Sequence, residues 1–214
     1  NADGTPKFWG RLIEVLPANK VQISDLIIKG GISAPGGGGI HNSGDLTLIR
    51  VAVRQNSTSF KKPMAGLSDY PGGGIFNDGG TLSLINSVVE LNVAVDAGGI
   101  YNNKQGTIPG TLNIQQGSIV QNNMATGQVG GVYNNQSNLL ITDSTVQLNQ
   151  EKGGSGGVSS DEGKVQILRS KILNNYIRDA ANPDPNLIEG RNLSFHSPAT
   201  VGTYEITESL IALD

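Results

Sequence analysis

Few residues in this chain of 214 have the types and spacing that acid–base, nucleophilic or metal chemistry requires. Its two histidines, His41 and His196, lie about six repeats apart in the alignment given below, too far to cooperate. Cysteine is absent, which excludes disulfides, thiolate metal sites and Cys nucleophiles. The sequence contains no G-x-S-x-G, Walker or EF-hand motif. We therefore predict no catalytic residue and no metal site, and favour a protein that is not an enzyme.

Calcium is the one cofactor for which we keep an alternative. Asp179, Asp184 and Glu189 could gather around a calcium ion in the loop after Asn175, because carboxylate oxygens are its usual ligands. Their spacing matches no known ligand pattern, so our first prediction is that the chain has no cofactor.

A row of aromatic residues is the more informative candidate. In successive repeats, the position between an apolar residue and an Asn is occupied by His41, Phe76, Tyr101, Tyr133 and Ser159. Because strand side chains alternate between faces, these residues should form one outward column with a spacing of about 4.8 Å. Exposed rings can stack on sugars, or they can shield the Asn corner beside them, and we favour shielding.

The elements that position this row come from an internal repeat. The distance from its second to its third apolar place is seven residues in each of five copies, whereas successive copies start between 25 and 35 residues apart. Short apolar stretches separated by Gly, Asn and Ser exclude helices and predict three strands per turn of a parallel β-helix. The first place is filled by Ile40, Ile75, Ile100, Val132 and Val158; the second by Leu46, Leu82, Leu112, Leu139 and Val165; the third by Val53, Val89, Ile119, Val146 and Ile172.

We predict a single domain of about seven three-strand rungs, each rung being one turn of the coil. Residues 1–10 form a cap or lead-in with Phe8 and Trp9, residues 11–175 form regular rungs, and residues 176–214 form a long loop and the last rung. In the first rung, Val15, Val21 and Ile28 should lie beneath the three columns. Nothing in the sequence resembles a closing cap after the last rung, so we expect a longer protein or a stacking partner there.

Two columns of Asn should turn the corners of the coil, because Asn tolerates left-handed backbone angles and its amide can hydrogen-bond along a stack. The first column contains Asn42, Asn77, Asn102 and Asn134, and the second contains Asn56, Asn92, Asn122, Asn149 and Asn175.

The bulk composition agrees with an all-β coil and limits the partners. Charged residues make up 15% of the chain, Gly number 30 and aromatics make up 5%. A net charge of -3 leaves no basic footprint for nucleic acid. No apolar run is long enough to insert into a membrane. The chain starts at Asn1 rather than Met, which suggests a piece of a longer protein.

The segments Gly38 to Leu48 and Gly130 to Asn134, with their Gly-Gly-Ile/Val-aromatic-Asn phrase, resemble the repeats of bacterial right-handed parallel β-helix proteins of the pectate-lyase-like superfamily. They are similar in particular to the polymorphic outer-membrane-protein type, whose repeat reads GGGIYNxGxLTL. The resemblance implies a secreted, adhesin-like module at the bacterial surface. It also implies two alternatives, a carbohydrate-binding or lyase-like protein and an accessory subunit of a surface assembly.

Lyases with this fold combine calcium-binding carboxylates with a Lys or Arg base. The nearest equivalents here are Asp25 beneath Arg50, and Lys29 beneath Arg54 and Glu90. Opposite charges one rung apart are typical of a solvated sheet face, and we interpret them so.

Two long insertions, at residues 57–71 and 176–190, leave the same corner of the coil and could wall a trough. Loops on a rigid scaffold are where binding residues concentrate. We therefore predict that a glycan or another surface protein binds there, with Phe76, Tyr101 and Tyr133 beneath it and Lys61, Lys62 and Asp184 on the walls.

Overall fold

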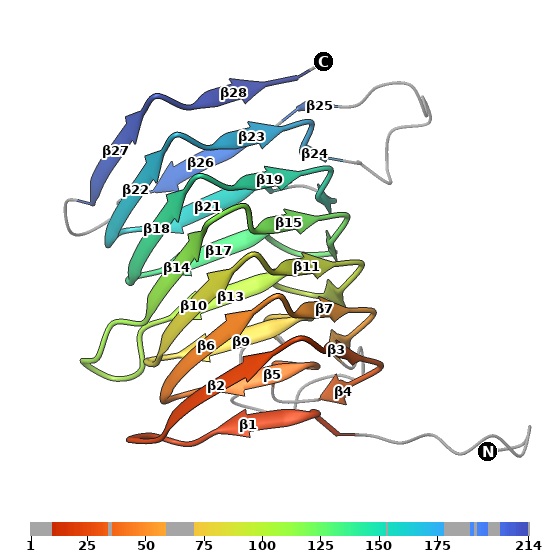
Figure 1. The fold of residues 1–214 in the computed structure, drawn as a ribbon. Helices are drawn as coiled ribbons and strands as arrows, with labels where there is room; N and C mark the ends of the chain where they lie inside the picture. The colour runs from red at the N-terminus through yellow and green to blue at the C-terminus, as the bar shows by residue number, and fades with distance from the viewer. Residues whose placement is uncertain are drawn as a thin grey trace, which may run out of the picture.

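The computed structural model describes residues 10–33, 36–58, 71–152, 154–177, 189–190, 192–196 and 202–213. These residues form a right-handed parallel β-helix that rises from β1 to β28 (Figure 1). Each of its four sheets contains seven strands, one from each rung except that the seventh strand of the fourth sheet, β25, lies in the connection between rungs six and seven. The predicted fold class and the number of rungs are therefore confirmed.

The first sheet contains β1 (Ile13–Val15), β5 (Ile40–Asn42), β9 (Ile75–Asp78), β13 (Ile100–Asn103), β17 (Val132–Asn135), β21 (Val158–Asp161) and β26 (Leu193–His196). The second contains β2 (Lys20–Ser24), β6 (Asp45–Ile49), β10 (Thr81–Ile85), β14 (Thr111–Gln115), β18 (Asn138–Thr142), β22 (Lys164–Leu168) and β27 (Thr203–Thr207). The third contains β3 (Ile27–Lys29), β7 (Ala52–Arg54), β11 (Val88–Glu90), β15 (Ile119–Gln121), β19 (Thr145–Gln147), β23 (Lys171–Leu173) and β28 (Leu210–Ala212).

A fourth, narrow sheet was not predicted. It contains β4 (Ile32–Ser33), β8 (Ser57–Thr58), β12 (Val93–Ala94), β16 (Met124–Ala125), β20 (Gln150–Glu151), β24 (Tyr176–Ile177) and β25 (Glu189–Gly190). Its strands have only two residues each, too few to show an alternation in the sequence. All described strand pairs in the four sheets are parallel except β24 with β25, which is antiparallel.

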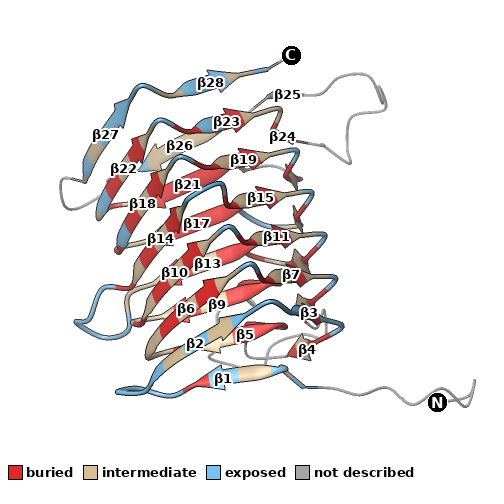
Figure 2. Cartoon of the chain, viewed as in Figure 1, coloured by how far each residue is buried: buried red, intermediate tan, exposed pale blue. Residues whose placement is uncertain are grey.

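The core is a stack of apolar columns inside the coil (Figure 2). The first and second columns are confirmed, since their members are Cα partners on neighbouring strands and are at most 2% exposed. Burying each Val, Leu or Ile contributes roughly 1.5 to 3 kcal/mol, so these columns account for most of the stabilisation.

One member of the third column was predicted wrongly. Val120, not Ile119, pairs with Val89 and is buried, whereas Ile119 lies on the outer face opposite Val88. The turn after β14 has one extra residue, because Gln116 and Gly117 both take positive φ. A slip of one residue moves every side chain to the opposite face.

The same slip misplaced one Asn. Asn123, not Asn122, continues the second Asn column, and its Oδ1 accepts hydrogen bonds from the backbone N–H and the Nδ2 of Asn92. Asn122 instead occupies the exposed corner with φ 52°.

The two columns are hydrogen-bonded ladders inside the coil. The first joins Asn42, Asn77, Asn102 and Asn134 through Nδ2-to-Oδ1 bonds of 2.7 Å. The second joins Asn56, Asn92, Asn123, Asn149, Asn175 and Asn192. Asn192 was not predicted as a member, because it reaches the ladder from beyond an insertion.

The first rung begins in a different register from the prediction. Ile13, not Val15, pairs with Ile40, and Val15 lies beside Asn42. Val21 and Ile28 lie beneath Leu46 and Val53 as predicted. Phe8 and Trp9 lie outside the described residues.

Leu91 provides a test of the corner geometry. Its side chain is 46% exposed and its φ is 56°, a left-handed angle that favours Asn over Leu. We expect Leu91→Asn to raise the free energy of unfolding by up to about 1 kcal/mol, measured as a higher urea midpoint. Val88→Asn, in β11, is the control and should not stabilise; equal effects of the two changes would contradict the corner assignment.

Candidate functional site on the outer face of the first sheet

The aromatic row lies on the outer face of the first sheet, in the predicted register. His41, Phe76, Tyr101, Tyr133 and Ser159 are successive Cα partners on β5, β9, β13, β17 and β21. The ring of His41 stacks on that of Phe76 at 5.1 Å. Phe76 with Tyr101 and Tyr101 with Tyr133 make edge contacts at 5.6 Å and 4.9 Å. Each ring therefore packs against the next one, and the rings do not form one flat platform.

Tyr133 is buried, which corrects the expectation that every ring of the row is outward and exposed. It is 6% exposed and packs with Ala97 and Val129, and Tyr101 packs against the same cluster. Ala97 and Val129 belong to the segments that lead into β13 and β17, so these segments cover the upper part of the row. The accessible rings are those of His41, Phe76 and Tyr101, which are half-buried.

A second row of polar side chains runs beside the rings. Asn103 donates from Nδ2 to Asp78 Oδ1 at 2.8 Å, and Asn135 donates from Nδ2 to Asn103 Oδ1 at 2.9 Å. Toward the C-terminal end of the same face, the Tyr133 hydroxyl on β17 donates to Asp161 Oδ2 on β21 at 2.5 Å. The two rows give this face half-buried rings beside amide and carboxylate groups, a combination that suits a hydroxyl-rich ligand.

The lower end of the face holds a charged cluster that the sequence did not predict. Arg11 Nη1 lies 2.6 Å from both Glu14 Oε1 and His41 Nδ1, and His41 Nε2 lies 3.8 Å from Asp78 Oδ2. A guanidinium only donates, so Nδ1 accepts in its contact with Arg11. The cluster was missed because the wrong register for Val15 hid the position of Glu14 beneath His41.

Burial and local charge shift three pKa values on this face. Partial burial acts to raise the pKa of Asp78, but the nearby His41 ring and the hydrogen bond from Asn103 outweigh it and lower the pKa. Burial raises the pKa of Tyr101 to about 12, and the Asp96 carboxylate adds to the rise. Burial and the hydrogen bond to Asp161 raise the pKa of Tyr133 still further.

We expect alkaline pH to destabilise the coil through these two phenols. A folded pKa above the ordinary value of about 10 means that the fold favours the protonated form. The stability that the protonated phenol contributes is fully present below about pH 10. It is lost as the pH rises toward the folded pKa, which is about 12 for Tyr101. Urea midpoints from about pH 8 to 11 should fall, and the fall should be shallower in the double variant Tyr101→Phe, Tyr133→Phe. An identical slope in this variant would contradict the assignment.

The predicted walls of the trough lie outside the described residues. These include Lys61, Lys62, Asp179 and Asp184, and only the backbone of Glu189 is placed, in β25. The described residues before each insertion show that the two insertions follow β8 and β24, which are four strands apart in the fourth sheet. The binding roles of Lys61, Lys62 and Asp184 remain predictions.

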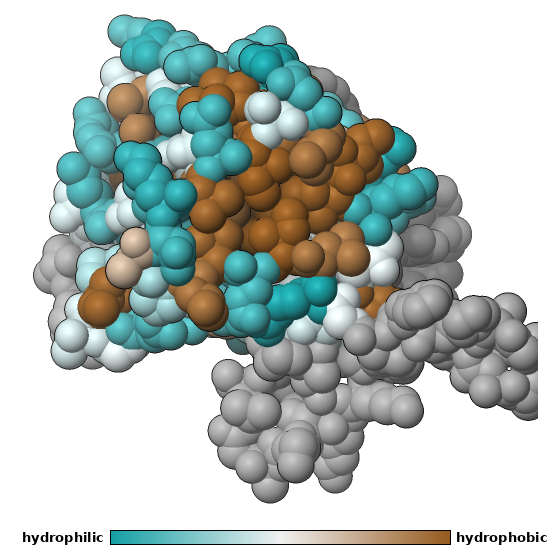
Figure 3. All heavy atoms as spheres, turned by 60° about the horizontal axis from the view of Figure 1, so that its bottom comes forward, coloured by the Kyte–Doolittle hydropathy of each residue, from teal (hydrophilic) through white to brown (hydrophobic). Residues whose placement is uncertain are grey.

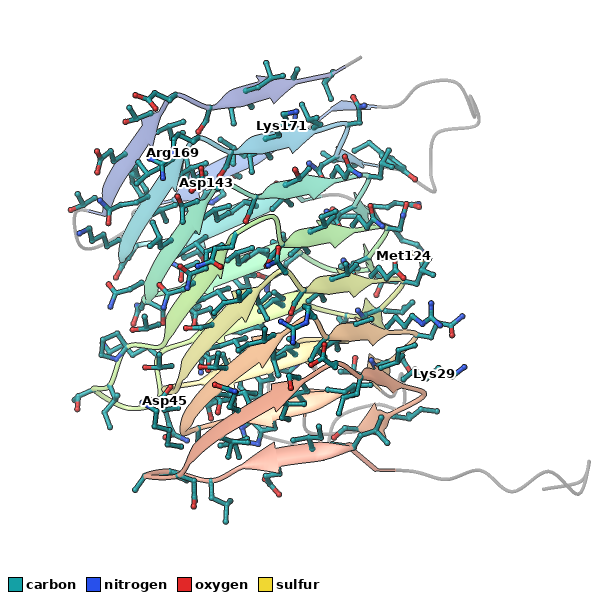
Figure 4. The ribbon with its side chains drawn as sticks, in the orientation of Figure 1. Lys29, Asp45, Met124, Asp143, Arg169 and Lys171 are labelled. Atoms are coloured by element: carbon teal, nitrogen blue, oxygen red, sulfur yellow. The ribbon has the colours of Figure 1, made fainter. Side chains whose placement is uncertain are left out.

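Charged pairs on the other faces join neighbouring rungs. Arg50 Nε donates to Asp25 Oδ1 at 2.6 Å, as the predicted stacking requires, and Arg169 Nε donates to Asp143 Oδ1 at 2.8 Å (Figure 4). Arg54 Nη1 lies 3.8 Å from Glu90 Oε1. In each of these pairs the partners come from adjacent rungs.

Within the described ranges no group of three or more His, Cys, Asp or Glu side chains is placed to hold a metal ion. The same ranges contain no helix that is long and apolar enough to span a membrane.

No family model, no curated protein and no solved structure matches the chain.

Proposed function

We propose that the chain is a structural and interaction module of a bacterial surface or secreted protein, an adhesin-like β-helix without catalysis of its own. One observation carries the proposal: the polar side chains of the outer faces bond along the rod, from each rung to the next. Examples are Arg50 with Asp25, Gln121 with Glu90, and Arg169 with Asp143.

These rung-to-rung bonds stabilise the coil and hold the polar side chains of each outer face in defined positions. Exposed ion pairs contribute little singly, about 0 to 1 kcal/mol, but the buried Asn ladders continue the same pattern inside the coil. This bonding inside and outside the coil supports the role of a rigid rod that presents its outer faces to a partner.

A reaction assay tests the absence of catalysis. The protein is incubated with pectin, alginate and chondroitin, with and without calcium, and the ultraviolet absorbance of unsaturated uronate ends is followed. We expect no new ends. Their appearance with the purified protein, and not with a heat-denatured control, would replace the structural proposal with a lyase.

The half-buried rings support carbohydrate binding as a second candidate. Phe76 lies between His41 and Tyr101, beside the row formed by Asp78 and Asn103. Phe76→Ala should reduce retention in pectin, alginate or chondroitin affinity gels several-fold if a glycan rests there. Asn86→Ala, at an exposed corner away from this face, is the control. Retention that is absent, or equal in wild type and Phe76→Ala, would leave the ring row with a structural role only.

A further inference from the structure

His41 belongs to the charged cluster at the end of the ring row nearest to β1. Its strand, β5, lies between β1 and β9 in the first sheet. Figure 3 views the rod from this end, where hydrophilic side chains surround an apolar area. The His41 side chain is only 18% exposed, and its ring stacks on that of Phe76 with 9° between the two planes. His41 is therefore a largely enclosed titratable group, and the groups that face it decide what a change in its charge does.

The Nδ1 atom of His41 faces two partners that it cannot bond at the same time. Arg11 Nη1 lies 2.6 Å away, and a guanidinium can only donate. Glu14 Oε1 lies 3.3 Å away, and an ionised carboxylate can only accept. A bare Nδ1 therefore bonds Arg11, whereas a protonated Nδ1 bonds Glu14. The protonation of one atom selects between the two contacts.

The other ring nitrogen, Nε2, gains a partner only when the ring is charged. It is shielded from solvent, and among the described residues it has no hydrogen-bond partner. Asp78 Oδ2 lies 3.8 Å away, too far for a hydrogen bond but close enough to attract a charged ring. Asn103 Nδ2 and Gln105 Nε2 donate to this carboxylate at 2.8 Å and 3.0 Å, so it is held in place beside the ring.

The charges around the ring balance only when it is protonated. Three charged groups face it: Arg11 from the segment before β1, Glu14 from β1 and Asp78 from β9. The remaining ring contact, Phe76 on β9, is uncharged. One guanidinium and two carboxylates leave one excess negative charge beside a neutral ring and none beside an imidazolium. Histidine side chains ordinarily change charge between about pH 5 and 8, so this is the range in which the change is expected.

We propose that His41 is a proton-operated switch between the first rung and the ring row. At neutral pH, Arg11 donates to the bare Nδ1 and joins the segment before β1 to β5. When the ring takes up a proton from solvent, Nδ1–H bonds Glu14, Nε2–H approaches Asp78, and Arg11 loses its bond to the ring. An imidazolium on the face of Phe76 is a favourable cation–π contact, so this end of the row becomes positively charged. The inference goes beyond the proposed function and does not depend on any ligand.

Arg11 is the group that moves in this switch. Its Nη1 also lies 2.6 Å from Glu14 Oε1, and its Nη2 donates to the Gly36 carbonyl at 3.4 Å. The Glu14 carboxylate can accept from a guanidinium and an imidazolium together, because its two oxygens offer about four lone-pair sites. Repulsion between two cations then moves Arg11 away from the ring, while Glu14 keeps both groups in the cluster. The change is therefore local, and the coil stays folded in both states.

A pH titration of the intact 214-residue chain by NMR tests the switch. The ring nitrogens of His41 report its protonation, and the guanidinium signals of Arg11 report the loss of its contact. Between about pH 8 and 5, both sets of signals should change with one shared midpoint.

The same spectra contain two matched controls. Arg50 donates to Asp25 at 2.6 Å and lowers the pKa of that carboxyl, which stays ionised, so the Arg50 signals should show no midpoint in this range. The other histidine of the chain, His196, lies on β26 with Nδ1 3.4 Å from Asp161 Oδ1. Its titration should leave the Arg11 signals unchanged.

Two variants separate the steps. His41→Gln keeps a side-chain oxygen that can accept from Arg11 but takes up no proton in this range, so the Arg11 midpoint should be lost. Asp78→Asn removes one of the negative charges that attract the protonated ring, so the shared midpoint should fall by roughly one pH unit.

Three outcomes overturn the proposal. They are Arg11 signals that stay constant while His41 titrates, an Arg11 midpoint that persists in His41→Gln, and a midpoint that does not fall in Asp78→Asn. The wild-type titration requires no substitution, so the first outcome remains decisive even if a variant does not fold.

Discussion

Replacing Asn123 by Ala should lower the free energy of unfolding by roughly 2 to 6 kcal/mol, because two buried backbone groups lose their partners. The Oδ1 of Asn123 accepts from the backbone N–H of Asn92 at 3.1 Å, and its Nδ2 donates to the Val89 carbonyl at 2.9 Å. Asn123 is fully buried, so water cannot take over either bond. Urea unfolding followed by circular dichroism measures the change.

The neighbouring residue is the matched control for this prediction. Asn122→Ala changes an exposed corner with φ 52°, where only the left-handed preference of Asn is lost. This should cost no more than about 1 to 2 kcal/mol. A larger loss for Asn122→Ala than for Asn123→Ala would show that the sequence-based register is right and the described one is wrong.

Leu112→Ala should also destabilise strongly, by roughly 2 to 5 kcal/mol, through lost burial and the cavity left behind. Leu112 is fully buried in β14, between Leu82 and Leu139 of the adjacent rungs. Asn113→Ala, on the outer face of the same strand, should change the free energy of unfolding by less than about 0.5 kcal/mol. Equal urea midpoints for Leu112→Ala and wild type would mean that the second column faces solvent.

The architecture could be predicted because each inward column repeats an apolar type at a fixed spacing. The step of seven positions from Leu82 to Val89 runs along β10, through Asn86 with φ 48° and Ser87, and into β11. Such a spacing specifies which side chains face inward in every rung. The first Asn ladder follows from the same logic, since its Asn residues are two positions after the inward apolar residue.

The errors in the predicted register of the third column, the second Asn column and the first rung have local causes that the repeat pattern does not reveal. Gly117 adds one residue to a corner, and its neighbours Ile119 and Val120 are both apolar, so composition could not decide which one is buried. The sequence signal for the extra corner residue was Gly117. Its φ of 77° is a left-handed turn angle, so this residue lies in the corner and not in a strand. In the first rung, Ile13 and Val15 lie two positions apart on the inward face and are both apolar, so composition could not decide which one pairs with Ile40.

The site was predictable in register but not in exposure. Alternation placed Phe76, Tyr101 and Tyr133 on one outer face, and the strand pairs confirm it. Their burial depends on the segments with Ala97 and Val129, whose packing over Tyr133 is a long-range contact that no periodicity encodes. The binding role of these rings remains a prediction.

A double-mutant cycle of Asn92→Ala and Asn123→Ala tests most directly the claim that side chains bond from rung to rung. The two side chains share a buried hydrogen bond of 2.9 Å, so their effects on the free energy of unfolding should couple by about 0.5 to 3 kcal/mol. The cycle with Asn122→Ala in place of Asn123→Ala should be additive within about 0.3 to 0.5 kcal/mol. Additivity of Asn92→Ala with Asn123→Ala, and coupling with Asn122→Ala, would contradict the ladder and the register of the whole coil.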